Sequence, residues 1–350
     1  MIFLNTRRKI FLLISIGVIG VGIAFFGIEI YFPKINKVPS SQRFLYIPRG
    51  TDYDSLLHIL RNKKIISNEF SFKLNAKIFS LRNHVHDGRY ELKSGMRIMN
   101  LIRQIKNGQQ TPVKLTIRKF RTKNEFAHFI SSKLEIDSTE FINLLNDSLY
   151  QKNNFGCNIE NALSLFVPNT HEVYWNITLD DLMERMKTEY TKFWNAERLA
   201  KADSLGFSPA EITTIASIVE EETNEDSDKV LIAGVYINRL RKNMKLDADP
   251  TLKFAMNRFE LTRLYTKHTK FESPYNTYMH KGLPPGLICI PSVSTIDAVL
   301  KYADKNLQND YLYFCASATK RGYSVFAKTF DEQKKNAKIY QHYLDSINIH

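Results

Sequence analysis

The sequence predicts an α+β fold with a single N-terminal transmembrane helix. Three observations support this class: residues 10–28 carry no charge, residues 43–112 alternate short strand and helix patterns, and the region from residue 113 onward combines helical spacing with later strand-like segments. Because a chain of 350 residues that is 43% hydrophobic can bury one large core or two modest ones, we expect one membrane segment and two domains.

The first predicted element is "IFLLISIGVIGVGIAFFGI", residues 10–28, which approaches the roughly 20 apolar residues of a membrane-spanning helix. A cleaved signal peptide is the alternative, but its apolar run is usually about 7–15 residues and is followed by small side chains, unlike "EIYFPK" here. Basic residues at 7–9 predict an internal N-terminus and an external body. We therefore expect a cytoplasmic stretch at 1–9, an anchor in the lipid bilayer at 10–30 and a linker at 31–42.

The next predicted unit is a small mixed α/β accessory module at residues 43–112. Its start, "RFLYIPRG", indicates a short strand, and "TDYDSLLHILRNKKII" indicates a helix with leucines on one face. The same order of strand, turn and helix recurs at 87–108 in "DGRYELKSG" and "MRIMNLIRQIKNG". Small units of this kind stack on one another, so we expect one compact module.

The remaining residues, 113–350, predict a larger α+β domain. It begins with a strand in "VKLTIRKF" and a helix in "KNEFAHFISSKL". Aromatic and charged residues recur at helical spacing from 179 to 205. From residue 286 onward, "GLICI", "YLYFCAS" and "YSVFAKT" are rich in β-branched and aromatic residues, which favours strands.

Charge and cysteine content exclude several classes of function. The net charge of +13 favours anionic surroundings such as phospholipid headgroups, nucleic acid or acidic cell-wall polymer, but it is spread along the chain without a long basic block, so charge alone selects none of them. Among partners, we expect no nucleic acid. The three cysteines lack the spacing of a metal knuckle or a small disulfide framework, which favours buried thiols. The histidines of "HVH" at 84–86 have no evident third ligand, so we expect no metal. The sequence has no HExxH, GxSxG or phosphate-binding GxxxxGK[ST] pattern.

The stretch "IASIVEEETNEDSD", residues 215–228, places several acids at the end of an apolar helix. The start of that helix is predicted by Ser208 as N-cap, Pro209 at the first helical position, and Glu211 completing a capping box. Apolar side chains recur at i, i+3, i+4 and i+7 and define the face that packs inward. They are Ile212, Ile215, Ala216 and Val219.

The helical projection gives the three consecutive glutamates different surroundings. At about 100° per residue, Glu221 points away from the apolar face into solvent, whereas Glu220 and Glu222 lie on its two flanks. Glu220 shares its flank with polar Thr213 and Ser217. Partial burial there would raise its pKa and let it donate a proton near neutral pH. The alternative is an acid-rich helix end that is simply solvated.

Four motifs together resemble the endolytic murein transglycosylases, the MltG/YceG-like family. They are "ASIVEEET" at 216–223, "VYINRLRKNMKLDADPT" at 235–251, "SPYNTYMHKGLPPGLI" at 273–288 and "YLYF" at 311–314. The resemblance implies an enzyme of the bacterial inner membrane that cuts nascent peptidoglycan glycan strands, with its body periplasmic. It also implies a LysM-like module at 43–112, a YceG-like catalytic domain at 113–350, and cell-wall synthases as candidate partners.

The resemblance assigns candidate roles to the acids and the amide of these motifs. Glu220 falls on the catalytic acid of the family and Glu222 on a second acidic position. Asn238 is similar to a hydrogen-bonding group of the cleft, although a surface residue is equally compatible with the pattern. Asp249 precedes a proline, which forces an extended or turn conformation that can aim its carboxylate at a ligand. The alternative for Asp249 is an ordinary turn residue.

The "YNTY" motif offers substrate contacts for a sugar. Its members, Tyr275, Asn276, Thr277 and Tyr278, combine aromatic rings, which pack on pyranose faces, with hydrogen-bonding groups. Tyrosines beside the turn "GLPPG" can also be purely structural. The sequence departs from the family pattern at Ser324 and Gln333, where many members carry histidines, and in "TIRKF" at 116–120.

The implied reaction needs one acid and no metal or other cofactor. Glu220 would protonate the oxygen between N-acetylmuramic acid and N-acetylglucosamine and then accept the proton of the C6 hydroxyl, leaving a 1,6-anhydro end. Glu220 and Glu222 diverge by about 160° on one helix, which disfavours them as the two carboxylates of a hydrolase. Two alternatives remain: a hydrolytic muramidase that uses Asp249, and a tethered peptidoglycan-binding scaffold without catalysis.

Overall fold

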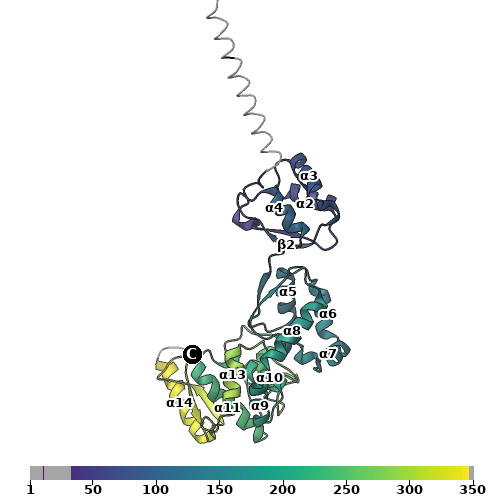
Figure 1. Ribbon diagram of the computed structural model, residues 1–350. Coiled ribbons are helices and arrows are strands. Elements are labelled where there is room, and N and C mark those ends of the chain that lie inside the picture. Colours follow the sequence, from purple (N-terminus) through teal and green to yellow (C-terminus); the bar gives the residue numbers. More distant parts are fainter. Residues whose placement is uncertain (1–10, 12–32, 347–350) are drawn as a thin grey trace, which may run out of the picture. The chain divides into compact units, whose positions relative to one another are not determined.

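The computed structural model describes Phe11 and residues 33–346, which divide into two compact units (Figure 1). The N-terminal unit extends to Lys114 and also includes Glu172–Ile177. The C-terminal unit comprises Leu115–His171 and the residues from Thr178 onward. The predicted division into an accessory module at 43–112 and a catalytic domain from 113 stays a prediction about function.

Within its described residues, the N-terminal unit contains a two-stranded antiparallel sheet and three α-helices. The sheet pairs Phe44 with Glu91 and Ile47 with Gly88. Its elements are β1 (Phe44–Ile47), α2 (Tyr53–Asn62), α3 (Glu69–Ile78), β2 (Gly88–Glu91) and α4 (Ile98–Lys106). Both predicted strand and helix pairs are confirmed. Helix α3 was not predicted, because its buried face includes polar Ser71 and Asn75 beside Phe72 and Ala76 and therefore lacks a clean apolar pattern.

The C-terminal unit is mainly helical. Its helices are α5 (Lys123–Lys133), α6 (Ser138–Asn146), α7 (Ser148–Phe155), α8 (Leu179–Phe193), α9 (Ala196–Leu205), α10 (Pro209–Glu222), α11 (Asp226–Arg241), α12 (Asp249–Ala255), α13 (Val293–Lys301) and α14 (Phe330–Ser346). The strands β5 (Tyr313–Ala316) and β6 (Ser324–Ala327) form an antiparallel pair, and β3 (Val113–Thr116) pairs with β4 (Thr170–Val173). Helices α10, α11 and α13 contact one another at the centre of the core.

Helix α11 approaches α13 closely because of a glycine. A Cβ atom at Gly234 would lie 2.4 Å from the ring of Tyr302, which immediately follows α13 and is fully buried. Any larger residue would therefore push the two helices apart. This close packing fixes the helix that carries several residues of the candidate site.

The segment "GLICI" was predicted as a strand, and this prediction is wrong. Residues 286–290 form a buried irregular segment. Its backbone is satisfied by single contacts: Ile288 N–H donates to Ser217 Oγ at 3.0 Å, and Ile290 N–H donates to the Phe120 carbonyl at 2.9 Å. Apolar composition indicated burial correctly but did not supply a partner strand.

The predicted fold class needs one correction. The α+β class holds, but the transmembrane helix included in it is not supported. Within Phe11 and residues 33–346, no helix is long and apolar enough to cross a membrane. The predicted anchor at 10–30 lies, apart from Phe11, outside the described residues. Apolar composition alone therefore does not establish a membrane-spanning element in this structure.

Candidate active site

Helix α10 carries the three glutamates to one end of the core. Its start has the predicted capping box: Ser208 Oγ accepts from the Glu211 N–H, and the Glu211 carboxylate accepts from the Ser208 N–H at 2.8 Å. Residues 212–219 are all buried. The helix is therefore held on every side, so its C-terminal turn presents Glu220, Glu221 and Glu222 in fixed directions.

Glu220 joins α10 to the start of α13. Its Oε2 accepts hydrogen bonds from Ser292 Oγ, at 2.9 Å, and from Thr295 Oγ1. Ser292 is also the N-cap of α13, where its hydroxyl accepts the Thr295 N–H. A carboxylate at this end of a helix is stabilised by the helix dipole and the capping hydroxyls. These contacts give Glu220 a clear structural role, and its predicted catalytic role stays a prediction.

Glu221 is not the solvated residue that the helical projection predicted. Its side chain is only 14% exposed, and it accepts two hydrogen bonds from Arg121, at 2.8 and 3.0 Å. Lys119 Nζ lies 3.1 Å from the same carboxylate. Burial acts to raise the pKa of Glu221, but hydrogen bonds and charges of Arg121 and Lys119 outweigh it and leave the pKa below its ordinary value. Arg121 and Lys119 belong to a loop about 100 residues earlier in the chain, and their side chains pack over Glu221.

Glu222 is the glutamate whose environment suits proton transfer. Its side chain is partly buried, and Tyr236 on α11 donates a hydrogen bond of 2.6 Å to Glu222 Oε1. Burial raises the pKa of Glu222 to about 7, and the negative charge of Asp249 acts in the same direction, while the Tyr236 hydrogen bond opposes them. A carboxyl group with this pKa can exist in both protonation states near neutral pH.

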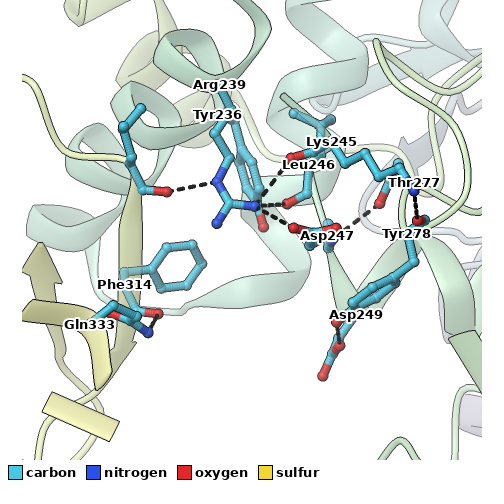
Figure 2. Close-up of polar contacts among 12 residues, drawn as sticks. Tyr236, Arg239, Lys245, Leu246, Asp247, Asp249, Thr277, Tyr278, Phe314 and Gln333 are labelled. Atoms are coloured by element: carbon cyan, nitrogen blue, oxygen red, sulfur yellow. Dashed lines mark hydrogen bonds and ion pairs between the residues drawn. The ribbon is translucent and has the colours of Figure 1, made fainter. Parts of the chain in front are cut away.

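Glu222 faces a cavity of about 240 Å³, which we call the acid pocket. Much of its wall appears in Figure 2, where Arg239 and Tyr236 lie above Phe314 and Gln333 in the view, and Asp249 and Tyr278 lie at the other side. The pocket combines aromatic, acidic and amide side chains. Its lining residues are Glu222, Tyr236, Arg239, Leu246, Asp247, Asp249, Tyr313, Phe314 and Gln333.

Arg239 fixes the loop that leads to Asp249. Its guanidinium donates to the Leu246 carbonyl at 2.8 Å and to Asp247 Oδ2 at 3.1 Å, and its Nε donates to the Leu312 carbonyl at 2.6 Å (Figure 2). Asp247 has a positive φ of 51°, which is uncommon for a residue other than glycine. Because Arg239 is itself buried, these bonds hold a sharp bend immediately before α12.

Asp249 lies at the start of α12 and lines the acid pocket, as the proline after it allows. The Tyr278 hydroxyl donates a hydrogen bond to Asp249 Oδ1. Burial, together with this bond and the charge of Asp249, raises the pKa of Tyr278 well above its usual value, so the phenol stays protonated. Asp249 and Tyr278 are thus brought together with Glu222 around one site.

The other predicted contact residues bind the protein itself. The Asn238 amide donates to the carbonyls of Asn309 and Tyr311, at 2.8 and 3.1 Å. The Asn276 amide donates to the Thr269 and Phe271 carbonyls, at 3.0 and 2.7 Å. Thr277 Oγ1 accepts the Ala248 N–H at 3.0 Å and bonds Thr251 Oγ1 at 2.8 Å. These contacts stabilise the loops around the site, and roles for Asn238, Asn276 and Thr277 in substrate binding stay predictions.

Tyr275 lies away from the acid pocket, beside a second cavity. Its ring packs against Phe254 with the ring centroids 4.8 Å apart. Both rings line a cavity of about 350 Å³ together with residues that precede and begin α5. Burial raises the pKa of Tyr275 to about 12, so its hydroxyl is neutral at physiological pH.

Several residues of the acid pocket were missed from the sequence. Tyr236 and Arg239 belong to the motif "VYINRL" and are the residues on either side of the pair Ile237 and Asn238. Only the Asn238 amide of this motif was predicted as a site residue, although a tyrosine and an arginine three residues apart share one helix face. Gln333 was noticed as a departure from the family pattern and lines the pocket from α14. Across the described ranges, no group of His, Cys, Asp and Glu could hold a metal ion.

Comparisons with known proteins agree with these motifs. A family model described as the YceG-like family matches residues 45–339. A protein of Bacillus subtilis named endolytic murein transglycosylase is 27% identical over 338 residues, which cover 91% of each chain. A protein of the same name from Streptococcus pneumoniae is 24% identical, and the match covers 86% of this chain and 58% of that relative.

A solved structure also matches. The crystal structure of a YceG-like protein from Listeria monocytogenes is 27% identical in sequence and superposes with a TM-score of 0.54. The match covers 83% of this chain and 98% of the Listeria chain. The similarity therefore extends over both compact units.

Proposed function

Because the chain belongs to the YceG-like family, we propose that it is a peptidoglycan lytic transglycosylase, a lyase that cuts glycan strands internally, with Glu222 as its general acid and base. The names of the relatives support the class of enzyme and the murein substrate. The choice of Glu222 rests on this structure. Since peptidoglycan lies outside the cytoplasmic membrane, the proposal also includes an extracytoplasmic location for the catalytic unit.

The observation that carries the assignment is the environment of Glu222. It lines the acid pocket with a pKa raised to about 7, whereas Glu221 is paired with two cations and Glu220 is hydrogen-bonded to the start of α13. A general acid must hold its proton until the substrate is bound, and burial provides this property. Tyr236 fixes the direction of the carboxyl group through its hydrogen bond.

In the proposed reaction, Glu222 first donates one proton and then accepts another. Protonated Glu222 donates its proton to the glycosidic oxygen between N-acetylmuramic acid and N-acetylglucosamine, and the bond to C1 breaks with an oxocarbenium-like transition state. The resulting carboxylate then takes the proton of the muramyl C6 hydroxyl, whose oxygen attacks C1. The products are a strand with a 1,6-anhydromuramyl end and a strand with a free C4 hydroxyl. Glu222 returns to its protonated form without consuming water.

Hydrolysis is the second candidate, and one observation favours it. Asp249 lines the acid pocket together with Glu222, so two carboxyl groups face a common space. A glycosidase that uses water or a covalent intermediate needs two such groups on opposite sides of the scissile bond. In that case, Glu222 would remain the acid and Asp249 would act as base or nucleophile.

Matched substitutions of neighbouring glutamates test the proposal. Glu222→Gln keeps the size of the side chain but removes the transferable proton, and we expect cleavage of purified glycan strands to fall by about 10²–10⁴-fold. Glu220→Gln should retain most activity because the amide can still accept from Ser292 and Thr295. The reverse result, in which Glu220→Gln is inactive and Glu222→Gln is active, would instead support the acid predicted from the sequence.

The products distinguish the candidate functions. Mass spectrometry of strands cleaved in ¹⁸O-labelled water should show anhydromuramyl ends without the label. Incorporation of the label at new reducing ends would make the protein a muramidase. A wild-type chain that binds strands but releases no ends would be a binding scaffold.

A further inference from the structure

Most of the net charge of the protein lies in the N-terminal unit. Basic side chains are spread along the whole chain, but the acidic side chains that balance them are not. Residues 33–114 contain 16 Lys or Arg and 5 Asp or Glu, a net charge of +11, whereas residues 115–350 contain 30 of each kind and are neutral in sum. The N-terminal unit is therefore the part of the molecule that attracts an anionic partner.

Helix α3, at the edge of this unit, presents apolar side chains outward (Figure 1). Its inward face includes polar Ser71 and Asn75, and the Asn75 amide donates to the Ser71 carbonyl at 2.9 Å. Phe70 and Ile78, in contrast, are 66% and 56% exposed, and Leu74 between them is half-buried. These three residues recur at every fourth position and form one apolar row along the helix. A row of exposed apolar side chains of this kind marks an interaction surface.

A basic row lies beside the apolar row. Lys73 and Lys77 are exposed and follow Phe70 by three and seven positions, which places them on the same side of α3. Lys73 Nζ lies 2.7 Å from the Glu69 carboxylate, but Arg61 shares this carboxylate at 2.6 Å. Lys77 has no ion-pair partner among residues 33–346. The outward face of α3 therefore combines apolar side chains with an excess of positive charge.

This combination suits the boundary between phospholipid headgroups and acyl chains. A helix at that boundary buries its apolar side chains by about 5–10 Å, while lysine side chains extend along the surface to reach phosphate groups. A soluble polyanion would pair with the lysines but leave Phe70 and Ile78 in water. A purely apolar partner would cover these two residues but leave the lysines without counter-charges. A surface that is apolar and anionic at once matches both rows.

We propose that the outward face of α3 docks onto the anionic phospholipid surface of a bilayer. Phe70, Leu74 and Ile78 enter the boundary region, and Lys73 and Lys77 pair with lipid phosphates. The remaining positive charge of the N-terminal unit adds a longer-range attraction that salt weakens. This contact is peripheral and needs no membrane-spanning helix. It goes beyond the proposed reaction, because it concerns the other compact unit.

A tryptophan placed in the apolar row reports this contact in the full-length protein. Phe70→Trp keeps an aromatic side chain that favours the membrane interface, and the emission of Trp175 and Trp194 in the wild type gives the background. Lipids brominated in their acyl chains should quench the variant in vesicles rich in phosphatidylglycerol but not in vesicles of phosphatidylcholine alone, and high salt should reverse the quenching. Equal quenching in the two kinds of vesicle, or quenching in neither, would overturn the proposal.

Substitution of the basic row assigns the contact to α3. Lys73→Gln combined with Lys77→Gln, in the Phe70→Trp background, should lower the ratio of docked to undocked protein by about 30-fold, because each lysine near an anionic surface contributes a factor of roughly five. The ratio is read from the quenched fraction. Lys93→Gln combined with Lys114→Gln is the matched control, because it removes two exposed lysines of the same unit outside α3. An equal loss in the control would show that total charge alone matters and would overturn the assignment.

The same reporter excludes other occupants of this face. Without vesicles, iodide in solution should quench Phe70→Trp, and protection from iodide would show that another part of the chain or a second copy covers the face. Binding of soluble polyphosphate that depends on Lys73 and Lys77, without quenching by brominated lipid, would instead assign the face to a soluble anionic polymer. Either result overturns lipid docking.

The docking proposal and the proposed reaction can fail separately. Cleavage of soluble glycan strands by the Lys73 and Lys77 double variant should equal that of the wild type, because both lysines belong to the N-terminal unit and the acid pocket belongs to the C-terminal unit. A protein that docks but never cleaves strands would refute the reaction and leave the lipid surface standing. A protein that cleaves strands but shows no lipid quenching would do the opposite.

Discussion

The three glutamates at the end of α10 show how position along one helical turn separates chemistry from structure. Glu220 stabilises the start of α13, Glu221 pairs with Arg121 and Lys119, and Glu222 enters the acid pocket. The residue type is the same in each case. The groups that reach them from other elements decide which carboxyl group joins two helices, which is paired with cations, and which can exchange a proton.

The raised pKa of Glu222 predicts a pH dependence of both rate and stability. The pKa of Glu222 in the folded protein, about 7, exceeds its ordinary value of 4.5, so its contribution to stability is fully present below pH 4.5 and is lost as pH rises through 7. Between pH 5 and 8, the wild type should lose about 1–3 kcal/mol of unfolding free energy that Glu222→Gln does not lose, after allowance for solvent screening. Urea unfolding at several pH values measures this difference.

The rate of strand cleavage should also depend on the protonation state of Glu222. Under the proposed mechanism, the rate of strand cleavage should decline above pH 7 as Glu222 loses the proton that it would donate. If the rate is constant from pH 6 to 9, or if the stability of the two proteins changes with pH in parallel, Glu222 does not titrate as described.

At the scale of elements, the bend between α11 and α12 determines the shape of the acid pocket. Arg239 is the residue that holds this bend, through carbonyls on both sides of the pocket and through Asp247. It also packs against the ring of Tyr313, with its central carbon 5.2 Å from the ring centroid. The geometry of a planar, forked donor is needed here, and a lysine cannot reproduce it.

We therefore expect Arg239→Lys to be costly. Loss of several buried hydrogen bonds should lower the free energy of unfolding by about 2–3 kcal/mol and should lower the rate of cleavage, because Asp249 and its loop lose their support. Arg241→Lys, at the exposed end of the same helix, is the control and should change stability by less than about 0.5 kcal/mol. Urea denaturation and cleavage assays on both variants provide the measurements, and similar values for the two would contradict the role given to Arg239.

Local signals in the sequence predicted elements better than they predicted the site. The start of α10 was predicted because its capping box lies within four residues, and the strands around residues 313 and 324 were predicted because β-branched and aromatic residues cluster there. The contact between Arg121 and Glu221 was not predictable from the sequence of α10, since Arg121 lies 100 residues earlier in the chain. The pKa of Glu222 likewise depends on Tyr236 and Asp249, whose positions only the tertiary fold defines.

At the scale of the whole molecule, one short segment belongs to the unit that precedes it in the chain. Residues Glu172–Ile177 are part of the N-terminal unit. The Trp175 ring contacts the Tyr46 ring edge-on at 5.1 Å, the Asn176 amide donates to Asp87, and Arg49 donates to the Asn176 carbonyl at 2.6 Å. The predicted boundary near residue 112 did not include this return of the chain.

The contacts of Glu172–Ile177 with the rest of the N-terminal unit predict the effect of removing residues before 113. A fragment that begins at residue 113 exposes Trp175 and leaves the polar groups of Asn176 without these partners, so we expect it to be less soluble and to unfold at a lower temperature than the fragment beginning at Arg43. Replacing Trp175 with Ser in the shorter fragment should recover solubility. Thermal unfolding and sedimentation of the fragments test this, and equal behaviour of the two unsubstituted fragments would argue against it.

The segment Glu172–Ile177 also affects how the protein would respond to a protease. The chain passes from one unit to the other near residue 114, and again on each side of this segment. A single cut between residues 114 and 115 therefore produces two polypeptides, but the longer one retains Trp175 and Asn176, which contact the shorter one. The nicked protein should migrate as one species on a native gel and as two on a denaturing gel. This connection would allow the nicked molecule to remain assembled.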